Sequence, residues 1–376
     1  MIRKSDIQWW VLEASKHPES APAIIEELAK RLVELDAENE RLCDELSLLR
    51  RRAPPTMGSA QVQTLQRKVT TLQNLLQHQV SSGTSVVFLS DRLQSVRIPL
   101  SSVSDLARKG HLDLDAQALL ELRCTVLVRP GDELLLLTNQ GRGLRRPSTD
   151  VPTLTGASAW HIAEGQALES GERLTAAVAV GEPPRFWTIA TRRGYVQRFV
   201  RVALDRKMTE GSRLFKSPFR NDEPVAIVNG DRGDLLLVTR WGKSVRFSQR
   251  AIEVQGSIAL DLDPDDEIAA ALALPADAEI LILTASGYAM RRDTAQVGAR
   301  TRPGGTGKAL IQARDVLSVC PYASRAQLLY LTYAGKLVLV PTTNIPLQSR
   351  LGKGTHLHDM QRDPAITVTP IPQELG

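Results

Sequence analysis

Apolar positions in the first quarter of the chain follow a heptad spacing. Between residues 23 and 52 they recur at alternating intervals of three and four, and the positions between them are mostly charged. This spacing predicts a coiled-coil helix, and its narrow apolar seam favours a homodimer. The alternative is an amphipathic helix that packs on its own domain. The predicted dimerisation residues are Ile25, Leu28, Leu32, Leu35, Asn39, Leu42, Leu46 and Leu49.

The residues around this helix refine the prediction. If Ile25 is an a position, Asn39 is one too, and a single asparagine there favours a parallel two-stranded register. Prolines and a glycine make residues 53–60 a linker. A second apolar seam predicts another helix at residues 61–80, which either continues the coil or folds back. Residues 1–22 allow a helical segment that either caps the dimer or docks on a partner.

After residue 84 the pattern changes to short apolar runs, and one unit occurs six times. Each copy has an apolar run that ends in Ser or Thr, then a short turn, then a second run. The anchors lie 48, 53, 48, 45 and 48 residues apart. Apolar runs of this length on either side of a tight turn predict a β-hairpin. The anchors are Ser90, Thr138, Thr191, Thr239, Thr284 and Thr332.

Two further positions of the unit repeat. Three residues after the anchor comes glycine in five copies, where a tight turn needs its conformational freedom, and Leu93 in the first copy. Seven residues after the anchor comes arginine in five copies and Leu339 in the sixth. The next position is often apolar, as at Ile98, Phe199, Phe247 and Val340. Because neighbours on a strand face opposite sides, we expect these arginines to point outward while the apolar neighbour packs inward.

Units of this length with about four strands are typical of propeller blades, so residues 84–372 are predicted to form a mainly β, six-bladed propeller. The segments TRRGYVQRFV and TRWGKSVRFS within it resemble the blade motif of the C-terminal domains of DNA gyrase A and of its topoisomerase IV counterpart. The resemblance implies a β-pinwheel, in which neighbouring blades exchange a strand, and a role in binding duplex DNA.

The chain departs from this family in two respects. The roughly 80 residues before the propeller are too few for a DNA-cleaving core, and all five tyrosines lie inside the repeats. We therefore expect a protein that is not an enzyme. The Gln-Arg-Arg-Gly-Gly-Lys-Gly loop that the family uses in DNA wrapping has no faithful copy; the nearest segments are residues 302–308 and 350–354.

The repeated basic residues suggest a curved track for DNA phosphates, with little sequence preference. The expected function is therefore binding, and bending or wrapping, of duplex DNA in an architectural or topoisomerase-accessory role. The alternative is a protein-interaction scaffold or docking component of a larger complex. The candidate DNA-binding residues are Arg97, Arg145, Arg192, Arg193, Arg198, Lys243, Arg246, Arg291, Arg292, Arg300, Arg302, Lys308, Lys336, Arg350 and Lys353.

Composition limits the classes of partner, cofactor and cellular location that this chain is expected to have. The chain has 376 residues, 42% of them hydrophobic and 24% charged, and a net charge of +5, too small to establish a nucleic-acid partner by itself. Its three cysteines offer neither a disulfide framework nor a metal site, and we expect no metal or cofactor. No apolar run is long enough for a membrane span. We expect a cytoplasmic, nucleoid-associated protein.

Overall fold

The chain divides into two compact units, Met1–Leu75 and Leu76–Gly376. In the first unit only Ala37 and Arg41 are described, and both are helical and exposed. The predicted coiled-coil seam, the linker at 53–60 and the second helix at 61–80 therefore lie outside the described residues. In the second unit the computed structural model describes residues 83–110, 121–153, 161–162, 168–231, 233–274 and 278–372.

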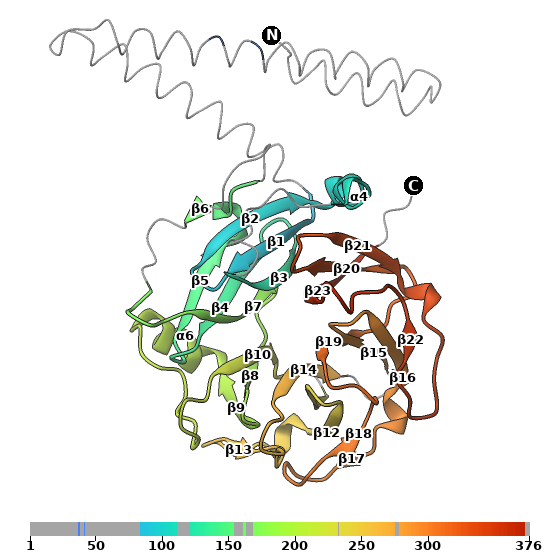
Figure 1. The fold of residues 1–376 in the computed structure, drawn as a ribbon. Coiled ribbons are helices and arrows are strands. Elements are labelled where there is room, and N and C mark those ends of the chain that lie inside the picture. The colour runs from blue at the N-terminus through green and yellow to red at the C-terminus, as the bar shows by residue number, and fades with distance from the viewer. Residues whose placement is uncertain are drawn as a thin grey trace, which may run out of the picture. The chain divides into compact units, whose positions relative to one another are not determined.

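The described residues of the second unit form six small sheets, which we name A to F in chain order (Figure 1). Each sheet is built around one of the six predicted hairpins, whose strands pair antiparallel. The hairpins are β1 (Ser85–Ser90) with β2 (Gln94–Pro99), β4 (Glu133–Thr138) with β5 (Gly143–Pro147), β8 (Phe186–Thr191) with β9 (Tyr195–Val200), β11 (Asp234–Thr239) with β12 (Lys243–Ser248), β15 (Glu279–Thr284) with β16 (Tyr288–Asp293), and β20 (Ala326–Thr332) with β21 (Leu337–Pro341).

A third strand pairs with the first strand of every hairpin, and these third strands lie nearest the centre of the ring in Figure 1. They are β3 (Leu122–Val128), β7 (Leu174–Val180), β10 (Pro224–Asn229), β14 (Ile268–Leu274), β19 (Val316–Pro321) and β23 (Ala365–Pro372). Sheets F and A meet and close the ring. One apolar cluster holds Phe88 and Leu122 of sheet A together with Leu329 of sheet F, and the Thr369 hydroxyl donates to the Thr125 carbonyl.

The outer edges of four sheets are completed by the following repeat. Each outer strand lies in the connection between the hairpin and the third strand of the next sheet, so neighbouring sheets exchange it as the resemblance implied. Such a strand covers backbone groups that a free sheet edge would expose. The exchanged strands are β6 (His161–Ile162) on sheet A, β13 (Ser257–Ile258) on sheet C, β17 (Ala299–Arg300) and β18 (Lys308–Ala309) on sheet D, and β22 (Thr355–His356) on sheet E.

Helices occupy the corresponding connections beside the other two sheets. Helix α6 (Arg201–Thr209) contacts β5 of sheet B, and helix α4 (Leu100–Lys109) contacts β21 of sheet F. Short 3-10 turns follow the second hairpin strand in the remaining repeats. They are η2 (Ser148–Asp150), η3 (Gln249–Ala251), η4 (Thr294–Gln296) and η5 (Thr342–Asn344).

The anchor hydroxyls explain why Ser or Thr repeats at one position. All six anchors are buried, and each side-chain oxygen accepts a hydrogen bond from the backbone N–H four residues later. In sheet D, for example, the Lys243 N–H lies 3.1 Å from Thr239 Oγ1. The hydroxyl thus satisfies a turn N–H that would otherwise be buried without a partner.

The glycine three residues after the anchor is required for two reasons. Gly242 has φ +77°, and a Cβ there would lie 2.3 Å from the carbonyl oxygen of Ile311. That close approach allows the Leu310 N–H to donate to the Gly242 carbonyl at 2.8 Å, which fastens the exchanged segment to the turn. Leu93 adopts the same backbone region with φ 65°, so the departure in the first copy preserves the turn.

Replacing Gly242 by alanine should therefore destabilise the β unit strongly. The left-handed backbone costs roughly 1–2 kcal/mol for an L-residue, and displacing the bonded segment costs about 1 kcal/mol or more in addition. The measurement is the free energy of unfolding in urea. Gly211→Ala is the matched control, because φ is +66° there and nothing lies within 4 Å of the added Cβ. Equal losses in the two variants would contradict the steric argument.

Candidate functional site

The repeated arginines do not form an outward ring. The side chains of Arg97 and Arg246 are buried, with relative exposures of 4% and 7%. The expectation that the repeated arginines point outward is wrong for these two, because both faces of their strand are covered where the next repeat packs against it; Arg145 remains exposed, and Arg198 and Arg291 are half-buried. The inward packing of the following residue is confirmed, since Ile98 and Phe247 are almost completely buried.

These arginines connect consecutive sheets. Arg246 donates from Nε to Asp234 at 2.7 Å and from Nη1 to the carbonyl of Thr294, in the next repeat's η4 turn, at 2.6 Å. Arg97 reaches across in the same way, with Nη2 3.1 Å from Thr153 Oγ1, which follows η2. Burial lowers the pKa of Arg97. The repeated position is therefore explained by packing between sheets.

Arg291 uses the same geometry in sheet E. It pairs with Glu279 of its own hairpin, with Nε 2.8 Å from the carboxylate, and its guanidinium lies 3.5 Å from the centre of the Tyr322 ring. Arg292, the next residue, is also buried and donates to the backbone carbonyl of Arg350 at 3.2 Å. Both side chains are engaged within the protein.

The other copies show how the position adapts to its neighbour. Arg198 donates to the Gly230 carbonyl at 3.1 Å and lies over the Phe186 ring, and burial lowers its pKa. Arg145 pairs with Asp205 of α6. Leu339 instead packs in the apolar cluster that includes Leu106 of α4. The sixth copy therefore carries leucine because an apolar helix face lies opposite it.

Several candidate cations of the turns are matched by carboxylates. Lys243 lies 2.6 Å from Asp263, and Lys336 lies 4.0 Å from Asp363. Arg192 lies between Glu223 and Glu267, at 3.5 and 3.8 Å. Arg193 differs, because its guanidinium is exposed beside the Phe219 ring and only its backbone N–H donates to Asp222.

A repeated acidic residue next to these turns was missed in the sequence. It lies 27 to 34 residues after the anchor, immediately before the third strand. In four repeats its carboxylate accepts the backbone N–H two residues after the anchor; the acceptors are Asp222, Asp266, Asp315 and Asp363. The varying interval and the different third-strand sequences hid this signal.

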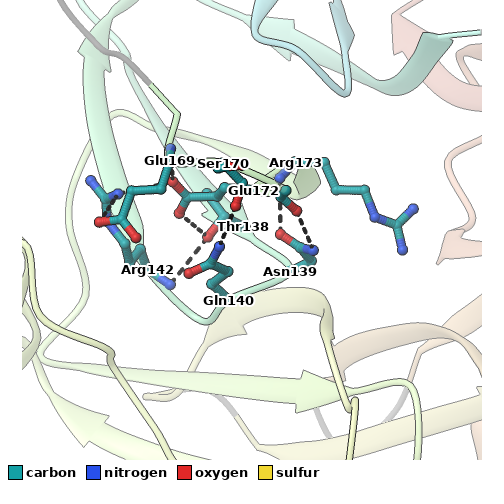
Figure 2. Close-up of polar contacts among 9 residues, drawn as sticks. Thr138, Asn139, Gln140, Arg142, Glu169, Ser170, Glu172 and Arg173 are labelled. Carbon is teal, nitrogen blue, oxygen red and sulfur yellow. Dashed lines mark hydrogen bonds and ion pairs between the residues drawn. The ribbon is translucent and has the colours of Figure 1, made fainter.

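Sheet B shows the most developed form of this arrangement (Figure 2). Glu172 has no exposed surface, and its carboxylate accepts the Thr138 hydroxyl at 2.7 Å and Arg142 Nη1 at 2.9 Å. The backbone N–H of Glu169 donates to the same carboxylate at 2.8 Å. A buried carboxylate with this many donors is satisfied internally, so we assign it a structural role.

Apart from Arg193, five candidate cations remain exposed and have no carboxylate within 4.0 Å among the described residues. They belong to two loops, residues 299–309 at the edge of sheet D and residues 349–354 at the edge of sheet E. The five are Arg300, Arg302, Lys308, Arg350 and Lys353. Arg314, which the sequence reasoning missed, joins them, with its guanidinium 4.7 Å from the Trp241 ring.

The two loops lie next to each other and are joined by a backbone hydrogen bond. The Gln312 N–H donates to the Gly352 carbonyl at 2.8 Å. Gly304, Gly305 and Gly307 all have positive φ, and Arg300 donates to the Gly304 carbonyl at 2.9 Å, which folds the first loop tightly. We call residues 299–314 together with 349–354 the cationic edge. Guanidinium and ammonium groups on glycine-rich backbone are suited to binding phosphate.

A separate cavity of about 800 Å³ lies at the edge of sheet B, beside α6. Its lining includes the aromatic Phe215 and Phe219 and the basic Lys207, Arg213 and Lys216. Lys207 donates to the Leu214 carbonyl, whereas Arg213 and Lys216 are exposed. Within the described part of the chain, no group of three metal-ligating side chains occurs, and no helix is long and apolar enough to cross a membrane.

The structural role of the repeated arginines can be tested at Arg246. We expect Arg246→Gln to lower the free energy of unfolding by about 2–4 kcal/mol, because Asp234 and the Thr294 carbonyl lose a buried charged partner. Lysine should not restore it, since one ammonium cannot reproduce the fork. Urea unfolding is the measurement. Arg302→Gln, on the exposed cationic edge, should change stability by less than about 0.5 kcal/mol. An unchanged midpoint for Arg246→Gln would refute the assignment.

Comparison with known proteins shows which sequences these repeats resemble. The sequence profile described as "DNA gyrase C-terminal domain, beta-propeller" matches residues 132–180, 233–275 and 278–315. The DNA gyrase A protein of Haloquadratum walsbyi is 26% identical over 256 residues, covering 61% of this chain and 29% of that protein. The DNA gyrase A protein of Staphylococcus epidermidis is 24% identical over 293 residues, covering 72% and 32%. The chain thus spans about a third of the length of these relatives.

Solved structures show the same fold. The DNA gyrase A C-terminal domain superposes with a TM-score of 0.62 at 16% identity and covers 76% of this chain and 99% of that domain. The C-terminal domain of DNA topoisomerase IV gives a TM-score of 0.57 at 17% identity, covering 77% and 94%. Part of the β unit thus matches the sequence profile of the DNA gyrase C-terminal domain, and the unit has the fold of the DNA gyrase A C-terminal domain.

Proposed function

We propose that this chain is a non-enzymatic protein that binds duplex DNA through the phosphate backbone, and that the cationic edge is its contact surface. One observation carries the proposal. At the cationic edge, six basic side chains lie on two adjoining loops, and no carboxylate lies within 4.0 Å of them among the described residues. A surface of this kind attracts a polyanion and releases counterions when it binds.

The contrast with other basic residues supports this choice of surface. Most cations of the hairpins are buried or paired, as Arg246 is with Asp234 and Lys243 with Asp263. A paired cation adds little to the field outside the protein. The cations at the cationic edge are exposed and keep their charge available, so phosphate contacts should concentrate there.

Relatives support duplex DNA as the polyanion. The full-length proteins with matching segments are DNA gyrase A proteins, and the fold is that of their C-terminal domain. We assign the six sheets as the blades of a six-bladed pinwheel. Side chains that contact phosphate give little sequence preference, so an architectural or topoisomerase-accessory role follows.

The N-terminal unit completes the proposal. We infer that the heptad seam from Ile25 to Leu49 forms a parallel coiled-coil dimer, which would carry two DNA-binding propellers and raise the avidity for one DNA molecule. Ala37 and Arg41 occupy the outer f and c positions of this heptad, and both are helical and exposed, in agreement with the assignment. The protein would act in the cytoplasm, on the nucleoid.

Replacing Arg302, Lys308 and Lys353 by glutamine should weaken duplex binding and flatten its salt dependence. Each phosphate contact contributes about 0.9 to the slope of log affinity against log salt, so three losses should reduce the slope by about 2 to 3. Fluorescence anisotropy of a labelled duplex at several salt concentrations measures it. Wild-type affinity that is insensitive to salt, or absent, would reject the proposal and favour a protein-interaction scaffold.

A matched variant controls for overall charge. Lys109, Arg129 and Arg325 are also exposed, and they lie outside the cationic edge. Changing these three to glutamine removes the same net charge and should leave the salt slope nearly unchanged. If both triple variants lose the same slope, general positive charge is responsible and the cationic edge is not the contact surface.

Dimerisation can be tested in the same chain. Leu32→Glu with Leu42→Glu places charge in the seam and should convert the dimer to a monomer, as measured by light scattering after gel filtration. Ala37→Glu with Arg41→Glu is the control, because these residues lie on the exposed side of the helix and the variant should remain a dimer. A monomeric wild-type protein would contradict the coiled-coil assignment.

A further inference from the structure

The outer edges of neighbouring sheets carry opposite charge. The edge of sheet C is formed by residues 253–267, which contain six acidic residues and neither lysine nor arginine. The adjacent edge of sheet D, residues 299–314, contains four basic residues and no acidic residue. We call residues 253–267 the acidic edge. The sign of the surface therefore changes between two successive repeats.

Contacts between the backbones show that the two edges adjoin. The Gly304 N–H donates to the Ala259 carbonyl at 3.0 Å, and the Asp261 N–H donates to the Gly305 carbonyl at 2.9 Å. The loop that presents Arg300 and Arg302 is therefore bonded directly to the segment that presents Asp261. No neutral spacer separates the attractive surface from the repulsive one.

Several carboxylates of the acidic edge are available to repel phosphate. Glu253, Asp261 and Asp265 are exposed and have no cation within 4.0 Å among the described residues. Asp263 and Glu267 are paired with cations of the hairpin turns. A phosphate brought onto this edge would meet like charge, which costs free energy at every contact.

We propose that a bound duplex lies along the edges of sheets D and E and ends at the acidic edge, so that this propeller contacts a short DNA segment and does not wrap DNA around its ring. The inference rests on the proposed DNA-binding function. On the side of sheet C, the acidic edge separates Arg302 and Lys353 from Arg213 and Lys216 at the edge of sheet B, so no continuous phosphate track joins them past sheet C.

The test compares salt slopes on duplexes of about 15 and about 60 base pairs, because the slope counts the phosphates contacted. It uses the full chain with Leu32→Glu and Leu42→Glu, so that one propeller acts in each particle, and light scattering checks the mass. A contact limited to sheets D and E should give the same slope on both duplexes. A track that continues around the ring should give a slope that rises with duplex length.

Two matched double variants locate the track. Arg302→Gln with Lys353→Gln should lower the slope by about 2 on both duplexes. Arg213→Gln with Lys216→Gln removes the same charge from the edge of sheet B and should leave both slopes unchanged. Equal losses from the two variants on the long duplex would overturn the proposal, although DNA binding itself would stand.

A third variant removes the boundary. Glu253→Gln, Asp261→Asn and Asp265→Asn neutralise the exposed acids and should raise the slope on the long duplex while leaving the short one nearly unchanged. No gain on the long duplex would show that the acidic edge does not limit the contact. If neither duplex binds the wild-type chain, the proposed function fails, which is a different result from failure of the boundary.

Discussion

Four of the six described sheets depend on a strand from the next repeat to complete their outer edge, and a short set of contacts secures that dependence. The exchanged segment enters beside the second hairpin strand, donates a backbone hydrogen bond to the carbonyl of the turn glycine, and is contacted by the arginine four residues further along the same strand. Since a hairpin with an open edge is marginal by itself, the arrangement ties the stability of each repeat to its neighbour. The repeated Ser/Thr, Gly and Arg positions are requirements of this junction.

The same junction determines which basic residues are available for function. An arginine that bonds a neighbouring repeat is not available to contact a ligand in solution. The cationic surface therefore has to come from the loops that carry the exchanged strands. These loops are free to vary, because their role in the fold is limited to a few backbone bonds. As a result one loop can present Arg300 and Arg302 while the adjoining one presents Asp261 and Asp265. Local charge on this fold can change from one repeat to the next without altering the framework.

Sequence reasoning recovered the parts of the fold that repeat in register. The six hairpins, their anchors and the turn glycines were predicted, because each has a fixed spacing and a local physical reason. The orientation of Arg97 and Arg246 was not, because a strand pattern says which residues share a face and not what covers that face. The buried acids such as Glu172 and Asp266 were also missed, since their partners lie about 30 residues away along the chain. Arg314 was missed as a member of the cationic edge because it does not occupy a repeated position, and its neighbour Trp241 is distant in the sequence.

The meeting of sheets F and A gives the first repeat a neighbour at its open side. Phe88 and Leu329 share one apolar cluster, and Thr369 bonds to Thr125 across a separation of 244 residues. An open array of repeats can fray from either terminal unit, since each end has only one partner. A closed circle has no terminal unit, and opening any junction exposes two apolar surfaces at once. Loss of structure in this unit should therefore be concerted, and its assembly has to wait until the last strand has been synthesised.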